Sequence, residues 1–151
     1  MKKIIFVLVV LSISICTGCS KSNSDLNNVK NGNFAADNSI TVGNALDHYK
    51  YFKSRDWKAT VTEQGRHVVT FKGTYDWENP EAVKYRNENN SHGAGWEAIA
   101  RDLVITFIIK ADGTFSNAAT VIRHESGGDK EIDYFGPGIS AILKNEPIPG
   151  F

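Results

Sequence analysis

The sequence is poor in cysteine and has no excess of either charge. Two cysteines among 151 residues cannot build a disulfide-rich scaffold or a four-cysteine zinc site. Lys+Arg and Asp+Glu both number 17, so the formal net charge of +0 offers no general attraction for nucleic acid or an anionic membrane. With 41% hydrophobic and 23% charged residues, the composition is that of one ordinary globular domain.

Recognisable enzyme motifs are also lacking. No G-x-S-x-G segment presents a nucleophile, and His48, His67, His92 and His124 are scattered without the spacing of metal ligands. Residues 93–98 read G-x-G-x-x-A, but an Asn-rich stretch precedes them instead of a strand, which disfavours a dinucleotide site. We therefore predict no catalytic residue, no metal site and no cofactor.

The N-terminus has the three-part layout of a secretory signal peptide. Lysines at residues 2–3 precede an apolar run over residues 4–15, and the small and polar residues Thr17 and Gly18 follow. The run is shorter than the roughly 20 residues that a membrane-spanning helix needs. We predict a signal peptide over residues 1–18.

The end of this segment resembles the lipobox of bacterial lipoproteins, in which a small residue precedes the cysteine that becomes lipidated. Thr17, Gly18 and Cys19 match the pattern, whereas Cys16 stands where the family usually has Leu. The resemblance implies cleavage between Gly18 and Cys19 and a diacylglycerol thioether on Cys19. Two or three acyl chains on one residue anchor a protein stably, whereas one chain alone binds marginally.

The lipobox also implies a location in the bacterial cell envelope. Ser20 after the lipidated cysteine implies outer-membrane attachment facing the periplasm if the host is diderm. A metal-binding or redox C-x-x-C made by Cys16 and Cys19 is disfavoured, because such a site needs a folded polar surround and usually more ligands.

The segment after the lipobox is rich in Ser, Asn, Lys and Asp. Its large apolar residues, Leu26, Val29 and Phe34, are isolated and sustain no hydrophobic period. We therefore predict a lipidated flexible tether over residues 19–39, which would hold the domain about 20–30 Å from the bilayer.

Residues 40–151 have the patterns of a single folded domain. Apolar residues at helical spacing predict a helix over residues 42–52, which Thr41 can cap. Alternation predicts strands, and Asp112-Gly113 predicts a tight hairpin turn. The further predicted elements are strands at 57–62 and 67–75, a short helix at 80–85, strands at 103–110 and 115–123, a polar loop at 125–133 and a helix around 139–143.

Consecutive hairpins without parallel crossovers indicate an α+β domain. We predict an antiparallel four-stranded sheet of two hairpins, with the N-terminal helix and a short C-terminal helix on one face. Residues 39–73 are similar to small bacterial envelope lipoproteins, and this resemblance implies no activity.

Large aromatic residues surround the polar stretch between the two hairpins. Trp77, Tyr85 and Trp96 flank an Asn-rich segment that includes His92, and such residues give much contact area at low entropic cost. The alternative interpretation is that these aromatic rings cover one end of the core. We therefore predict possible binding residues at Trp77, Tyr85, His92 and Trp96.

The leading functional hypothesis is a lipid-anchored, non-enzymatic binding module of the envelope. Its expected contacts are the membrane, through the lipid on Cys19, and another envelope protein, with no nucleic acid. Two alternatives stay open at this point: an envelope hydrolase whose site the spacing does not reveal, and an inhibitor or immunity protein against an envelope-acting enzyme.

Overall fold

The computed structural model describes residues 18–89, 101–125, 128–133 and 137–148. The described chain is α+β, with a five-stranded antiparallel sheet in which every strand pairs with its neighbour in sequence. The order is β3 (Phe52–Val61), β4 (His67–Tyr75), β5 (Arg101–Ile109), β6 (Phe115–Glu125) and β7 (Gly128–Asp133).

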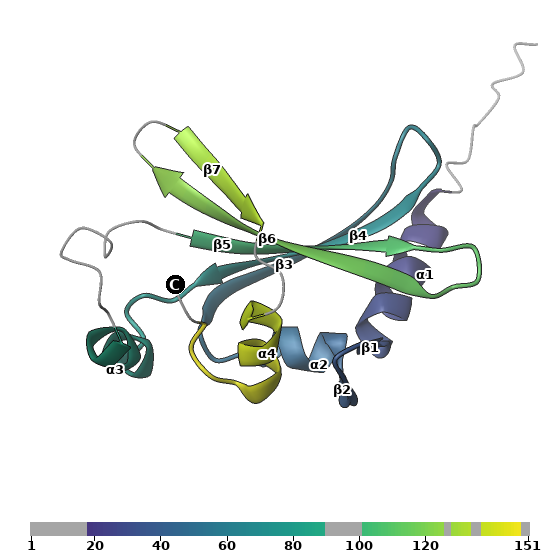
Figure 1. Cartoon of the computed structure of the whole chain (residues 1–151). Helices are drawn as coiled ribbons and strands as arrows, with labels where there is room; N and C mark the ends of the chain where they lie inside the picture. Colours follow the sequence, from purple (N-terminus) through teal and green to yellow (C-terminus); the bar gives the residue numbers. More distant parts are fainter. Residues whose placement is uncertain (1–17, 90–100, 126–127, 134–136, 149–151) are drawn as a thin grey trace, which may run out of the picture.

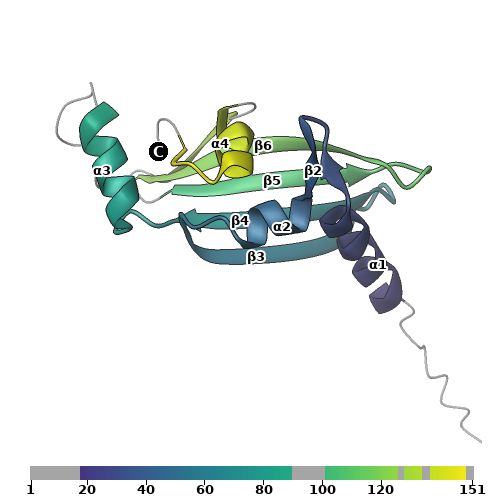
Figure 2. The ribbon, with the colours of Figure 1, turned by 90° about the horizontal axis from the view of Figure 1, so that it is seen from below.

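Helices and a small hairpin lie on one face of this sheet (Figures 1 and 2). They are α1 (Gly18–Asn31), the β1–β2 hairpin (Asn33–Phe34 and Asp37–Thr41), α2 (Val42–Asp47) and α4 (Pro137–Lys144), while α3 (Pro80–Asn89) stands at one end of the sheet. The opposite face carries no described helix, and we call it the open face.

Several predicted elements are confirmed. The strand predicted at residues 67–75 is β4, and the turn before it contains Gly65 at φ +74°, a left-handed conformation that glycine adopts without strain. Thr41 caps α2 by accepting a hydrogen bond from the Asn44 amide at 3.2 Å. The α2 helix ends at Asp47, earlier than predicted, because buried Tyr49 and Tyr51 turn the chain into β3.

The predicted four-stranded sheet is wrong in its strand count. The segment predicted as a polar loop at residues 125–133 instead contains β7, which pairs antiparallel with β6. Gly128, at φ +116°, begins the strand, which has little apolar alternation because it lies at the edge of the sheet.

The flexible tether predicted over residues 19–39 is also replaced by ordered elements. Within this range the chain forms α1, β1 and part of β2, and Val29 and Phe34 belong to the buried core. The three apolar residues that looked isolated each contact the domain, because Leu26 and Val29 share one face of α1. The folded domain therefore includes α1 and does not begin at residue 40.

A charged and aromatic contact fastens α1 to α2 and β3. The Lys30 ammonium lies 2.8 Å from the Asp47 carboxylate and 4.8 Å from the centre of the Trp57 ring. The Trp57 indole N–H donates to the other Asp47 oxygen at 2.7 Å. Gly43 permits the close packing, since a Cβ there would lie 2.9 Å from the Lys30 carbonyl oxygen. This seam makes α1 an integral part of the fold.

The core lies between the sheet and its covering elements. Phe71, Ile105 and Phe107 are fully buried on the covered face, where they meet side chains from α1, α2, α4 and the β1–β2 hairpin. The Tyr49 hydroxyl donates to the Glu146 carbonyl at 2.7 Å and so connects the segment after α2 to the segment after α4. In the described part of the chain, no helix has the length and apolar character needed to cross a bilayer.

Candidate functional site

The structure places part of the predicted aromatic region. Trp77 is half-buried against the core, with its ring 4.9 Å from that of Tyr75 and 5.2 Å from the Arg101 guanidinium. Tyr85 is half-buried on α3. Trp77 thus has the core-covering position that was the alternative interpretation, while His92 and Trp96 lie outside the described residues.

A cluster of charged residues lies on the open face at the same end of the sheet. Its members are Lys72, Asp102, His124 and Asp129, and we call it the Asp102 cluster. The Asp102 carboxylate is 2.7 Å from the Lys72 ammonium and 2.8 Å from His124 Nε2. His124 Nδ1 lies 2.8 Å from the Asp129 carboxylate. The imidazole is therefore held between two carboxylates.

The register of four strands brings these residues together. Thr74 lies opposite Asp102, Asp102 opposite Ile122, and His124 opposite Asp129. Alternation along β4 and β5 directs Lys72 and Asp102 away from Phe71 and Leu103, and hence onto the open face. The Asp102 side chain is only 4% exposed, whereas those of Lys72 and His124 are 47% and 36% exposed.

The electrostatics of the cluster favour its charged forms. Burial acts to raise the pKa of Asp102, but hydrogen bonds from Lys72, Thr74 and His124 outweigh it, so this pKa is lowered. The hydrogen bond to Asp102, and then that to Asp129, raises the pKa of His124. The bond to Asp102 likewise raises the pKa of Lys72. The cluster therefore places the Lys72 ammonium and the imidazole beside a buried carboxylate that favours their protonated forms.

Sequence reasoning missed this cluster. The sequence showed His124 only as one of four scattered histidines, and it placed Asp129 in a predicted polar loop. The sequence did contain one signal. Lys72, Asp102 and His124 all occupy even positions of their strands, and the three strands β4, β5 and β6 pair in chain order. Only the register shows that these positions meet.

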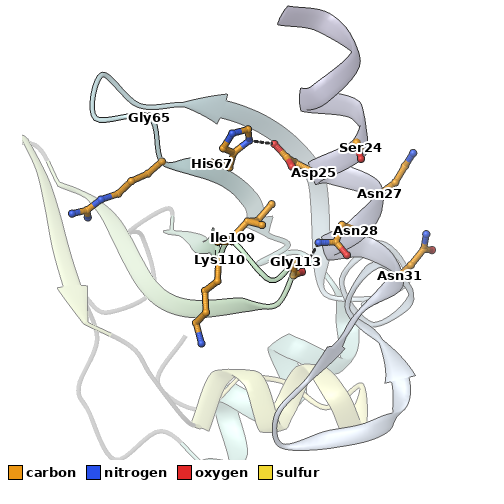
Figure 3. A pocket seen from close by; sticks show the side chains of 12 residues that line it. Ser24, Asp25, Asn27, Asn28, Asn31, Gly65, His67, Ile109, Lys110 and Gly113 are labelled. Carbon is orange, nitrogen blue, oxygen red and sulfur yellow. Dashed lines mark hydrogen bonds and ion pairs between the residues drawn. The ribbon is translucent and has the colours of Figure 1, made fainter.

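A second polar site is a cavity of about 860 Å³ between α1 and the turns of two hairpins (Figure 3). Inside it, His67 Nδ1 lies 2.6 Å from the Asp25 carboxylate, and Figure 3 shows the ring turned toward that group. The Asn28 amide donates to the Gly113 carbonyl at 2.7 Å. The cavity, here called the polar cavity, is lined by Ser24, Asp25, Asn27, Asn28, Asn31, Gly65, Arg66, His67, Ile109, Lys110, Ala111 and Gly113.

The two sites have different chemistry. In the Asp102 cluster both imidazole nitrogens are within hydrogen-bond distance of carboxylates, which stabilises the imidazolium and leaves neither nitrogen poised to accept a proton. The polar cavity offers amides, cationic side chains and the Asp25 carboxylate, which suit hydrogen bonding to a polar group. Among the residues that the structure describes, no group of His, Cys, Asp or Glu has an arrangement that could hold a metal ion.

Comparison of the chain with protein-family models, with curated proteins and with solved structures gave no match. The geometry of these two sites is therefore the basis for interpreting function.

Proposed function

We propose that the chain is a lipid-anchored, non-enzymatic protein of the bacterial envelope that binds another protein through the open face of its sheet. The observation that carries this proposal is the Asp102 cluster, in which Lys72 and His124 are exposed but fixed by a buried carboxylate. The anchor is the lipid on Cys19 that the lipobox implies.

The mixed charge of the cluster favours a protein partner. Lys72 is a cation and the carboxylates beside His124 favour its protonated form, whereas Asp129 and Asp56 are exposed anions close enough to act on the Lys72 pKa. A ligand of one charge sign, such as nucleic acid, would meet repulsion as well as attraction here. A protein surface can present both signs in complementary positions.

The rigidity of the surface supports the same proposal. Lys72, Asp102 and His124 lie on three paired strands, so binding would cost little ordering of the backbone. Arg101, the residue before Asp102, points to the covered face, where its guanidinium lies over the Trp77 ring, so the aromatic region lies behind the proposed surface and not on it.

The anchor is tested by the intact mass and membrane fractionation of the wild type and Cys19→Ala, expressed in a bacterial host. We expect a wild-type mass of residues 19–151 plus lipid, and loss of both the lipid and membrane association in Cys19→Ala. A soluble or uncleaved wild-type product would contradict the anchor.

The binding surface is tested by a photo-crosslinking residue at Asp56, which neighbours Lys72, in the full-length protein within its native host. We expect a discrete protein adduct that is lost when Lys72→Gln and His124→Gln are combined. The same crosslinker at Lys144 on α4, and the Lys144→Gln substitution, serve as matched controls. Equal adducts at the two positions, or no adduct at Asp56, would overturn the assigned surface.

A further inference from the structure

The N-terminal turn of α1 lies at the same end of the sheet as the tips of two hairpins (Figures 1 and 2). These tips are the β3–β4 turn, residues 62–66, and the β5–β6 turn, residues 110–114, and together they form what we call the hairpin-tip end. The contact between Asp25 on α1 and His67 on β4 holds α1 beside these turns.

This end also carries the exposed apolar side chains. Of the residues that the structure describes, Val61 and Ile108 are the exposed large hydrophobic residues, at 54% and 40%. Val61 is the last residue of β3 and Ile108 is next to the last of β5. Alternation places Val61 on the covered side and Ile108 on the open side of the sheet, so only a surface that meets the sheet end-on would contact both side chains.

Polar groups complete the surface. Arg66 and Lys110 line the polar cavity that opens here, beside the amides of α1. Glu63 and Asp112 lie in the same turns, and Asp112 accepts hydrogen bonds from Thr114. The surface therefore combines two apolar side chains with charges of both signs, which suits the interface of a bilayer better than a purely electrostatic contact.

We propose that the hairpin-tip end docks on the bilayer that anchors the chain, with Arg66 and Lys110 contacting headgroup phosphates at the mouth of the polar cavity. The inference rests on the proposed lipidation of Cys19, which belongs to the first turn of α1. At a rise of about 1.5 Å per residue, Asp25 lies only about 9 Å along the helix from Cys19. A headgroup layer is about 5–8 Å thick, so the lipid holds this end at the membrane surface.

A fluorophore at residue 64 tests the docking. In the mature lipoprotein Cys16 is removed and Cys19 is acylated, so Gln64→Cys provides a single free thiol in the β3–β4 turn. With the lipidated protein reconstituted in phosphatidylcholine and phosphatidylglycerol vesicles, we expect a blue-shifted emission that nitroxide headgroup lipids quench. The same label at Glu78→Cys, beyond the opposite end of β4, is expected to remain aqueous and unquenched.

A variant with three substitutions tests which side chains hold the hairpin-tip end on the bilayer. Combining Val61→Ser, Arg66→Gln and Lys110→Gln should abolish the quenching at residue 64 while the acyl mass and membrane fractionation remain, whereas Lys84→Gln with Lys144→Gln should change nothing. Equal emission and quenching at residues 64 and 78 in a lipidated, membrane-bound protein would overturn the docking and leave the anchor intact. Absence of the acyl mass would overturn both proposals.

Discussion

The covered and open faces of the sheet are built by the same strands but differ in the interactions they make. On the covered face, Phe107 is fully buried and its ring contacts those of Phe34, Trp57 and Phe115. On the open face, the adjacent residue Thr106 is only half-buried. An antiparallel sheet can be solvated on one side, so one face can stabilise the fold while the other carries charged and exposed groups.

The largest expected difference is in the free energy of unfolding, between substitutions of two neighbouring residues that lie on opposite faces of the sheet. Phe107→Ala should lower the free energy of unfolding by about 3–5 kcal/mol, because it removes a buried ring and leaves a cavity. Thr106→Ala should change it by no more than about 0.5–1 kcal/mol. Urea unfolding curves of the two variants measure this, and equal losses would contradict the asymmetry.

The Asp102 cluster should be the place on the open face where a substitution does reduce the free energy of unfolding. Asp102→Asn should cost about 1–3 kcal/mol of unfolding free energy, because it removes the buried carboxylate that Lys72 and His124 share. It should also lower the pKa of His124, followed by NMR of the imidazole. Asp129→Asn, at a more exposed carboxylate, should have a smaller effect on both quantities.

The seam between α1 and the domain can be tested at Asp47. Asp47→Ala should cost about 1–2 kcal/mol, because it removes the acceptor of both the Lys30 ammonium and the Trp57 indole N–H. Amide hydrogen exchange should then accelerate in α1 more than in β5. If α1 were a loose tether, its amides would already exchange rapidly in the wild type and Asp47→Ala would change little.

The smallest expected effect is a pH dependence of the unfolding free energy, which is caused by the Asp102 cluster on the open face. The raised pKa of His124 contributes stability that is fully present below about pH 6.5 and is lost as pH rises through the folded-state pKa. The lowered pKa of Asp102 contributes stability that is present above about pH 4 and is lost as pH falls through its folded-state pKa.

A His124→Gln comparison isolates the histidine contribution. The wild type should exceed His124→Gln in unfolding free energy by more at about pH 5.5 than at about pH 8.5. His48→Gln serves as the control, because His48 is exposed at the C-cap of α2 and its Nδ1 lies 3.1 Å from a backbone carbonyl oxygen, that of Asn44, and not beside a carboxylate as in His124. A difference that does not change with pH would contradict the assigned role of the imidazolium.

The α+β class and the two central hairpins were predictable because their strands either alternate or, at residues 103–110, are apolar on both faces, and because their turns contain glycine. Phe71 and Ile105 lie in such patterns, and Asp112-Gly113 forms the expected turn. The strand β7 was not predictable in this way, since it adds to the edge of a sheet that already exists and needs no apolar period of its own.

The prediction of a flexible tether over residues 19–39 was wrong because it relied on the polar composition of the segment and not on the positions of its few apolar residues. Leu26 and Val29 are three residues apart, which places them on one face of a helix, and Phe34 is buried after the following turn. Few apolar residues suffice to pack α1 against the domain, because Lys30 and Asp47 add an ion pair. The spacing of residues along the sequence does not reveal this pair. The Asp102 cluster escaped prediction for a related reason, since it depends on the alignment of separate strands.

The agreement between strand order and chain order has a consequence for how the domain forms. Each of β4, β5, β6 and β7 pairs with the strand that precedes it in the chain. The pairing partner of each of these strands is therefore already synthesised when the strand forms. Sequential pairing keeps loop-closure costs small and favours rapid folding. A chain that emerges N-terminus first can therefore assemble this sheet one strand at a time, with α1 and α2 already available to receive its apolar side.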